Sequence, residues 1–216
     1  MAEDLNRIAV RQLTASPRRI ADAALGLAVL VYAGVLVASD LADEDHALWR
    51  DHLSFFGSSE ASYPSAFALA QGFLALAALA WFASRWSELG RSGRILLPMA
   101  VLAAMGAAIW PIDCSPSDEL CEVIIRNRAV STSHDVHSLL AIVLFASLAA
   151  FAVSVSLLTR RRVAIAAAVV AVVGTGWIVA RPFAAGSGVV ELGVVIASVW
   201  NLKLVCSGPM DRTALR

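Results

Sequence analysis

Charged residues are scarce in this sequence. Asp, Glu, Lys and Arg make up 16% of the 216 residues, whereas apolar residues make up 59% and the mean hydropathy is +0.73. A soluble domain of this length cannot bury so much apolar surface. The shortage of charge therefore excludes a soluble globular protein and indicates a single membrane domain over residues 1–216.

The sequence also lacks a long basic patch of the kind that binds nucleic acid. Its arginines occur in short clusters at the ends of apolar runs, where anionic lipid headgroups and the insertion machinery account for them. The formal net charge is zero because basic segments and acidic segments cancel. We therefore expect membrane lipids as partners and no nucleic acid.

Six apolar stretches are each long enough to cross about 30 Å of hydrocarbon as a helix. They predict an all-α fold, namely a polytopic six-transmembrane-helix bundle, and a multi-pass protein of the cell membrane. The first stretch is too long for the core of a cleavable signal peptide, and no small-x-small cleavage site follows it, so we expect it to be retained. The stretches are residues 20–41, 66–83, 95–110, 136–158, 163–180 and 189–205.

The basic residues predict the orientation of the bundle. Most of the 17 Lys and Arg lie in an N-terminal arm, residues 1–19, in the second and fourth connections, and in the C-terminal tail. Basic segments stay in the cytoplasm, which predicts that both termini are cytoplasmic. The two long connections, residues 42–65 and 112–133, then face outward, and every histidine lies in them or directly after them. Any chemistry is expected on the outward side.

Cysteine is rare, with three residues in the chain. Cys114 and Cys121 share the second outward connection, and in an oxidising compartment they would form a disulfide worth about 2–3 kcal/mol. A metal-binding pair is the alternative, although metal-binding thiols usually stand closer together in sequence. Cys206, near the end of the sixth stretch, is interpreted as a small apolar packing residue.

A polar cluster opens the fourth stretch with the sequence Ser-Thr-Ser-His-Asp-Val-His-Ser, residues 131–138. Ser133 or Thr132 is expected to cap the helix, and a first-turn Asp suits the helix dipole. Capping explains neither His134 nor His137, which are three apart and share one helical face. Two neutral imidazoles at this spacing can present two nitrogens to one metal ion.

A metal-dependent intramembrane hydrolase is the first functional hypothesis. Acids and histidines at the outer ends of the spans should turn inward and form one polar pocket open to the outside. His52, His134 and His137 would hold a divalent metal such as zinc, and Asp113 would orient a water or act as general base. Ser54 or Glu191 would assist, and the substrate would be a lipid or an amide that arrives from the outward side.

A non-catalytic lipid-binding or envelope-assembly protein is the alternative. The same residues would then hold a lipid headgroup, for which Arg181 supplies the cation. A third interpretation is a purely structural network in which Arg181 pairs with Glu191 or Asp113. Transport is less favoured because the middle and inner thirds of the spans contain almost no ionisable group.

Short motifs recur at the ends of the predicted spans. They are His52-Leu53-Ser54-Phe55-Phe56-Gly57, Pro64 with Phe67, Trp110-Pro111-Ile112-Asp113, His134-Asp135-Val136-His137, and Gly188 with Glu191. The order of these motifs resembles a family of prokaryotic six-span membrane proteins known as domain of unknown function 998. The resemblance implies a six-span architecture and no activity, and it covers residues 21–205. The sequence departs from the family pattern at Phe55, where an acid often follows the serine. The layout is also loosely similar to transmembrane hydrolases related to alkaline ceramidases, which use a serine, an aspartate and three histidines around zinc, but the motif spacing differs.

Overall fold

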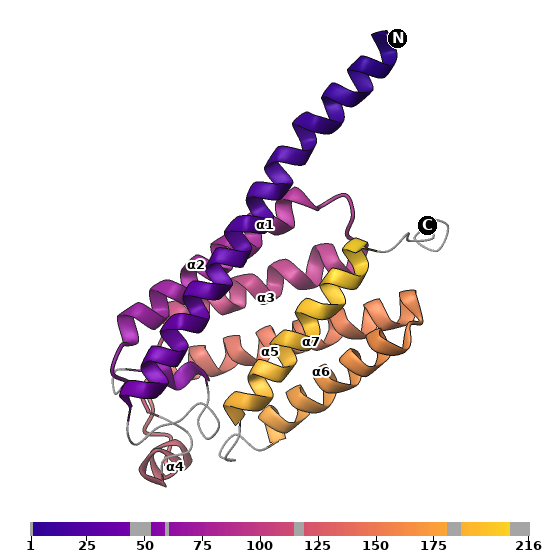
Figure 1. The fold of residues 1–216 in the computed structure, drawn as a ribbon. Helices are drawn as coiled ribbons and strands as arrows, with labels where there is room; N and C mark the ends of the chain where they lie inside the picture. The colour runs from indigo at the N-terminus through magenta and orange to yellow at the C-terminus, as the bar shows by residue number, and fades with distance from the viewer. Residues whose placement is uncertain (1, 44–52, 59–60, 115–118, 181–186, 208–216) are drawn as a thin grey trace.

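The computed structural model describes residues 2–43, 53–58, 61–114, 119–180 and 187–207, and these residues form helices and no strand. Figure 1 shows the elements in chain order. The all-α fold class is confirmed for the described part of the chain. The elements are α1 (Ala2–Ala42), the 3-10 helix η1 (Leu53–Gly57), α2 (Pro64–Ser84), α3 (Arg91–Ile109), α4 (Glu119–Arg126), α5 (Thr132–Thr159), α6 (Arg162–Ala180) and α7 (Ser187–Ser207).

Five of these helices, α1, α2, α3, α5 and α6, are long and apolar enough to cross a membrane. The sixth predicted stretch lies in α7, whose apolar part, Gly188–Leu202, is shorter. Large apolar side chains are exposed along the helices, among them Leu69 at 75% and Val173 at 64%. Such a surface is stable only against lipid, so the chain is a membrane protein.

Helix packing follows from small residues at the contacts. α3 lies between α2 and α5, α5 packs against α6 and α7, α6 packs against α7, and α1 packs against α2. A Cβ on Gly174 of α6 would lie 2.5 Å from Cγ2 of Val194, and a Cβ on Gly106 of α3 would lie 2.7 Å from Cδ1 of Leu140. The missing side chains let these helices approach closely, as expected for a bundle in lipid.

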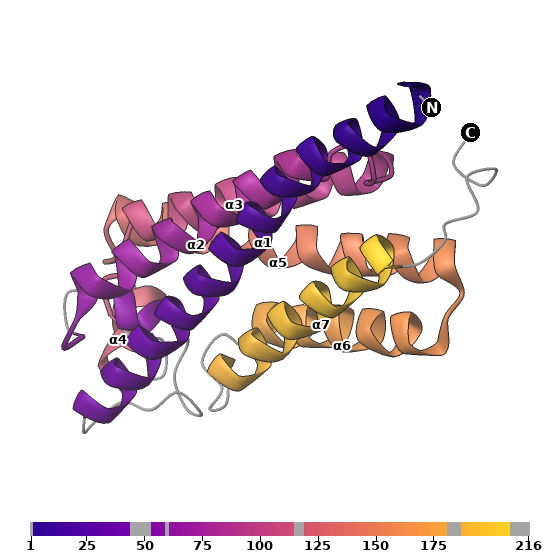
Figure 2. The ribbon, with the colours of Figure 1, turned by 45° about the horizontal axis from the view of Figure 1, so that its top comes forward.

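The two ends of the bundle differ. The turns between α2 and α3 and between α5 and α6 lie at one end, together with the last residues of α7, and η1 and α4 lie at the other (Figures 1 and 2). We call these the inner end and the outer end. An apolar cluster at the outer end packs η1 against α2 and α7, with Phe55 and Phe56 fully buried and the ring of Phe56 against that of Phe67.

Three details differ from the sequence-based predictions. Residues 2–19, predicted as an arm, are helical and continuous with the first span. The two long connections contain the short helices η1 and α4. The cap of α5 is Ser131 and not Ser133 or Thr132: the Ser131 hydroxyl accepts the His134 N–H at 3.2 Å, while Ser133 donates to the Pro111 carbonyl at 2.9 Å.

Candidate functional site

His137 is held at the outer end between α5 and the end of α3. Its Nδ1 lies 3.0 Å from the carbonyl oxygen of Ala107 and 2.7 Å from that of Trp110, and the side chain is 6% exposed. Carbonyl oxygens only accept hydrogen bonds, so Nδ1 carries the proton. In the neutral ring Nε2 is therefore the acceptor nitrogen.

His134, one turn earlier on α5, has the opposite arrangement. The backbone N–H of Asp113 donates to Nδ1 of His134 at 3.3 Å, and the ring is 5% exposed. A nitrogen that accepts cannot also carry the proton, so neutral His134 is protonated at Nε2. The two histidines thus present one donor nitrogen and one acceptor nitrogen.

Asp113 fixes the start of α5 in this part of the site through its contacts with Ser131. Its Oδ2 accepts the Ser131 N–H at 2.6 Å and its Oδ1 accepts the Ser131 hydroxyl at 2.7 Å. Partial burial opposes ionisation, but the two hydrogen bonds from Ser131 outweigh it and hold the pKa of Asp113 below its ordinary value. Both carboxylate oxygens are therefore engaged in holding the start of α5.

Glu191 brings α7 into the same region. Its side chain is 4% exposed, and Oε2 accepts the backbone N–H of Leu53 in η1 at 2.9 Å. Glu191 also lies within electrostatic reach of His137 and of Tyr32 in α1. The ring of Tyr32 packs against Phe67 with centroids 5.5 Å apart. Four elements, α1, η1, α5 and α7, therefore meet around one buried carboxylate.

The structure brings together some of the predicted site residues. His134 and Asp113 are in contact, and His137 and Glu191 are neighbours; we call these four residues the outer cluster. His52 and Arg181 lie outside the described residues, as does the side chain of Ser54, whose backbone is part of η1. Within the described ranges no three or more His, Cys, Asp or Glu side chains are placed to hold a metal ion.

The predicted disulfide is present. Cys114 and Cys121 are joined with an S–S distance of 2.01 Å and Cα atoms 5.7 Å apart. The bond links the residue that follows Asp113 to the first turn of α4, and the side chain of Cys121 is fully buried. The alternative of a metal-binding thiol pair does not apply to the oxidised pair.

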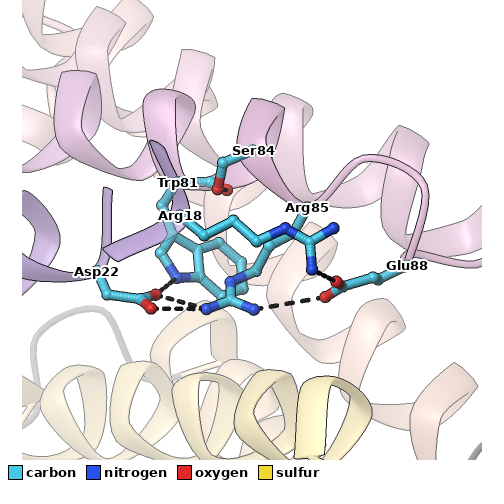
Figure 3. A network of polar contacts seen from close by, with 6 residues as sticks. All are labelled: Arg18, Asp22, Trp81, Ser84, Arg85 and Glu88. Atoms are coloured by element: carbon cyan, nitrogen blue, oxygen red, sulfur yellow. Dashed lines mark hydrogen bonds and ion pairs between the residues drawn. The ribbon is translucent and has the colours of Figure 1, made fainter. Parts of the chain in front are cut away.

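Sequence reasoning missed a polar network at the inner end (Figure 3). Arg85, at the end of α2, pairs with both carboxylate oxygens of Asp22 in α1 at 2.6 and 2.8 Å. Glu88 pairs with Arg18 at 2.5 Å and with Arg85 at 3.4 Å. Trp81 donates its indole N–H to Asp22 at 2.8 Å, and the Arg85 guanidinium lies 5.0 Å from the centroid of the Trp81 ring.

This network joins α1 to the turn between α2 and α3. Two positive and two negative groups alternate in it, so the charges of Arg18 and Arg85 are matched within the protein. The only sequence signals are the spacings of Arg18 with Asp22 and of Arg85 with Glu88, which suit helical neighbours. Neither spacing indicates that the two pairs meet.

Comparison with known proteins identifies a family and nothing closer. A family model described as "Protein of unknown function (DUF998)" matches residues 26–207. Neither the curated proteins nor the solved structures contain a match to this chain.

Proposed function

Because the chain belongs to the DUF998 family, whose function is unknown, we propose a function from the outer cluster. The protein is a six-span cell-membrane protein with cytoplasmic termini, and it binds the polar group of a membrane lipid or of a small molecule from the outward side. α7 supplies the sixth span. The proposed orientation rests on two observations. The turns between α2 and α3 and between α5 and α6 lie at the same end of the bundle, and both contain arginines.

The observation that carries the proposal is that Nδ1 has opposite hydrogen-bond partners in two buried histidines, carbonyl oxygens for His137 and a backbone N–H for His134. His134 has its N–H at Nε2 and His137 has its lone pair at Nε2, and the Glu191 carboxylate acts electrostatically on His137. Polar groups at the margin of a membrane are costly to bury and normally serve a ligand, a proton path or a polar cavity. One donor nitrogen and one acceptor nitrogen suit a ligand that carries both kinds of group, such as a phospholipid headgroup. Arg181 is the proposed cation for the phosphate.

Binding is favoured over hydrolysis by the partners of the two acids. Both oxygens of Asp113 hold Ser131, and Glu191 holds the backbone of Leu53. Asp113 is therefore committed to the helix cap, a role that competes with that of a general base. His134 would also have to move its proton to Nδ1 before it could bind a metal through Nε2, and that proton would face the Asp113 N–H.

Lipid retention tests the proposal. Native mass spectrometry of the detergent-purified protein, with added phosphatidylethanolamine or phosphatidylglycerol, should show bound lipid. His137→Ala and Glu191→Gln should each weaken retention by about tenfold or more, the effect of losing one charged or buried hydrogen bond. Ser138→Ala, on the exposed side of the same turn, is the control and should leave retention unchanged. Equal retention by all variants would overturn the proposal.

A zinc-dependent hydrolase is the second candidate, and one observation favours it. Histidines that bind metals usually donate their other ring N–H to a carbonyl or carboxylate, and Nδ1 of His137 faces two carbonyls. His137, Glu191 and His52 would be the metal ligands. His52 is included because it directly precedes Leu53, whose backbone N–H contacts Glu191. Ser54 would assist. About one zinc per chain, lost in both His137→Ala and His52→Ala, would support the hydrolase. Protein that contains no zinc after purification without chelators would exclude it.

A further inference from the structure

Helix α4 runs across the bundle. Figure 1 looks almost down the axis of α4, whereas the spanning helices lie across the same view. α4 therefore extends roughly in the plane of the proposed membrane, at the outer end. It cannot be a span, because its eight residues are too few to cross the hydrocarbon.

The two faces of α4 have opposite characters. Leu120 and Val123, three residues apart, share one face and are 65% and 53% exposed. Cys121 on the opposite face is fully buried and is fixed by its disulfide to Cys114. Glu122 and Arg126 form an ion pair along the side of the helix. A short helix that points apolar side chains away from the protein is typical of helices that lie at a lipid surface.

The exposed face of α4 continues a surface that lipid already covers. Ile109 and Trp110, at the outer end of the span α3, are 67% and 44% exposed. Cys114 follows Trp110 by four positions, and its Cα lies 5.7 Å from that of Cys121. The disulfide thus holds α4 near the level at which α3 leaves the membrane, where tryptophan is enriched.

We propose that α4 is an interfacial helix that rests on the outer leaflet, with the side chains of Leu120 and Val123 inserted between the lipids. Arg126 lies at the edge of this face and reaches the headgroups with its exposed guanidinium. The disulfide joins α4 to Cys114, which directly follows Asp113. Contact of α4 with the lipid surface therefore helps to fix Asp113, whose N–H contacts His134. This inference is independent of what the outer cluster binds.

Depth-dependent quenching tests the inference. In a Cys206→Ala background, Val123→Cys is labelled with an environment-sensitive fluorophore and placed in lipid nanodiscs, and Ala129→Cys, in the exposed turn after α4, is the control. We expect blue-shifted emission at position 123, with quenching by doxyl lipids and little by aqueous iodide. The control should show the reverse. Equal iodide quenching at both positions would overturn the proposal.

A measurement on the unmodified protein guards against a disturbed disulfide in the labelled variants. Hydroxyl-radical labelling of wild-type protein in nanodiscs should leave Leu120 and Val123 unmodified, although both are exposed on the protein surface. Labelling of both residues at the rate of solvated aliphatic side chains would overturn the proposal, as would equal iodide quenching at both labelled positions.

Discussion

Replacing Gly174 by alanine should destabilise the contact between α6 and α7. The new Cβ would lie 2.5 Å from Cγ2 of Val194 and 3.3 Å from Cγ1 of Val190. Val194 is fully buried, and a β-branched side chain has little rotamer freedom in a helix, so it cannot turn aside. The helices must separate locally.

The magnitude follows from two opposing effects. Overpacking a tight contact costs about 1–3 kcal/mol. Alanine in place of glycine in a helix returns about 0.5–1 kcal/mol, because the unfolded chain loses less freedom. We therefore expect a net loss of about 0–2.5 kcal/mol for Gly174→Ala. Gly176→Ala, two positions along the same helix with no atom within 4 Å of the new Cβ, should be neutral or slightly stabilising.

The assay is reversible unfolding of both variants in mixed micelles of increasing denaturing-detergent content, followed by circular dichroism. The expected separation between the two variants is about 1–3 kcal/mol, with Gly174→Ala the less stable. Equal stability would refute the close packing of α7 on α6. It would also remove the structural support for α7 as a sixth span.

Three further predictions concern other parts of the molecule. A double-mutant cycle with Asp22→Asn and Arg85→Gln should give a coupling energy of about 1 kcal/mol, since one guanidinium nitrogen donates to both carboxylate oxygens but Asp22 is 47% exposed; additive effects in the unfolding assay would contradict the network. The pKa of Asp113 is lowered from 3.8 in the folded state, so its contribution to stability is present above that pH and is lost as pH falls through the folded value. Protection of the Ser131 amide from hydrogen exchange, relative to the intrinsic rate at each pH, should therefore fall as the pH drops below 3.8 in wild-type protein and be reduced in Asp113→Asn above that pH. Reporter fusions after Arg162 and after Pro116 should report opposite sides of the membrane, and a shared side would refute the proposed topology.

The five long apolar helices were predictable because lipid imposes one simple requirement, a run of apolar residues long enough to satisfy its own backbone hydrogen bonds. The disulfide was predictable because Cys114 and Cys121 lie seven positions apart in the same connection. α4 and η1 were missed because short helices contain too few turns to show a period.

The outer cluster was predictable only as a set of residue types near one membrane boundary. The partners that decide its chemistry are backbone groups: the carbonyls of Ala107 and Trp110 and the N–H of Asp113. Every residue has the same backbone groups, so the sequence does not show which of them a side chain will contact. The pairing of Asp22 with Arg85 was missed for a related reason, since 63 positions separate them and only the packing of α1 on α2 brings them together.

The most direct test of the outer cluster as a preset ligand site is nitrogen NMR of the protein with ¹⁵N-labelled histidine in nanodiscs, with and without phosphatidylethanolamine or phosphatidylglycerol. The account predicts a proton on Nε2 of His134 and on Nδ1 of His137 at neutral pH. Bound lipid should shift the Nε2 signals of both rings and leave their Nδ1 signals in place. The same protonated nitrogen in both rings, or no shift with either lipid, would contradict it.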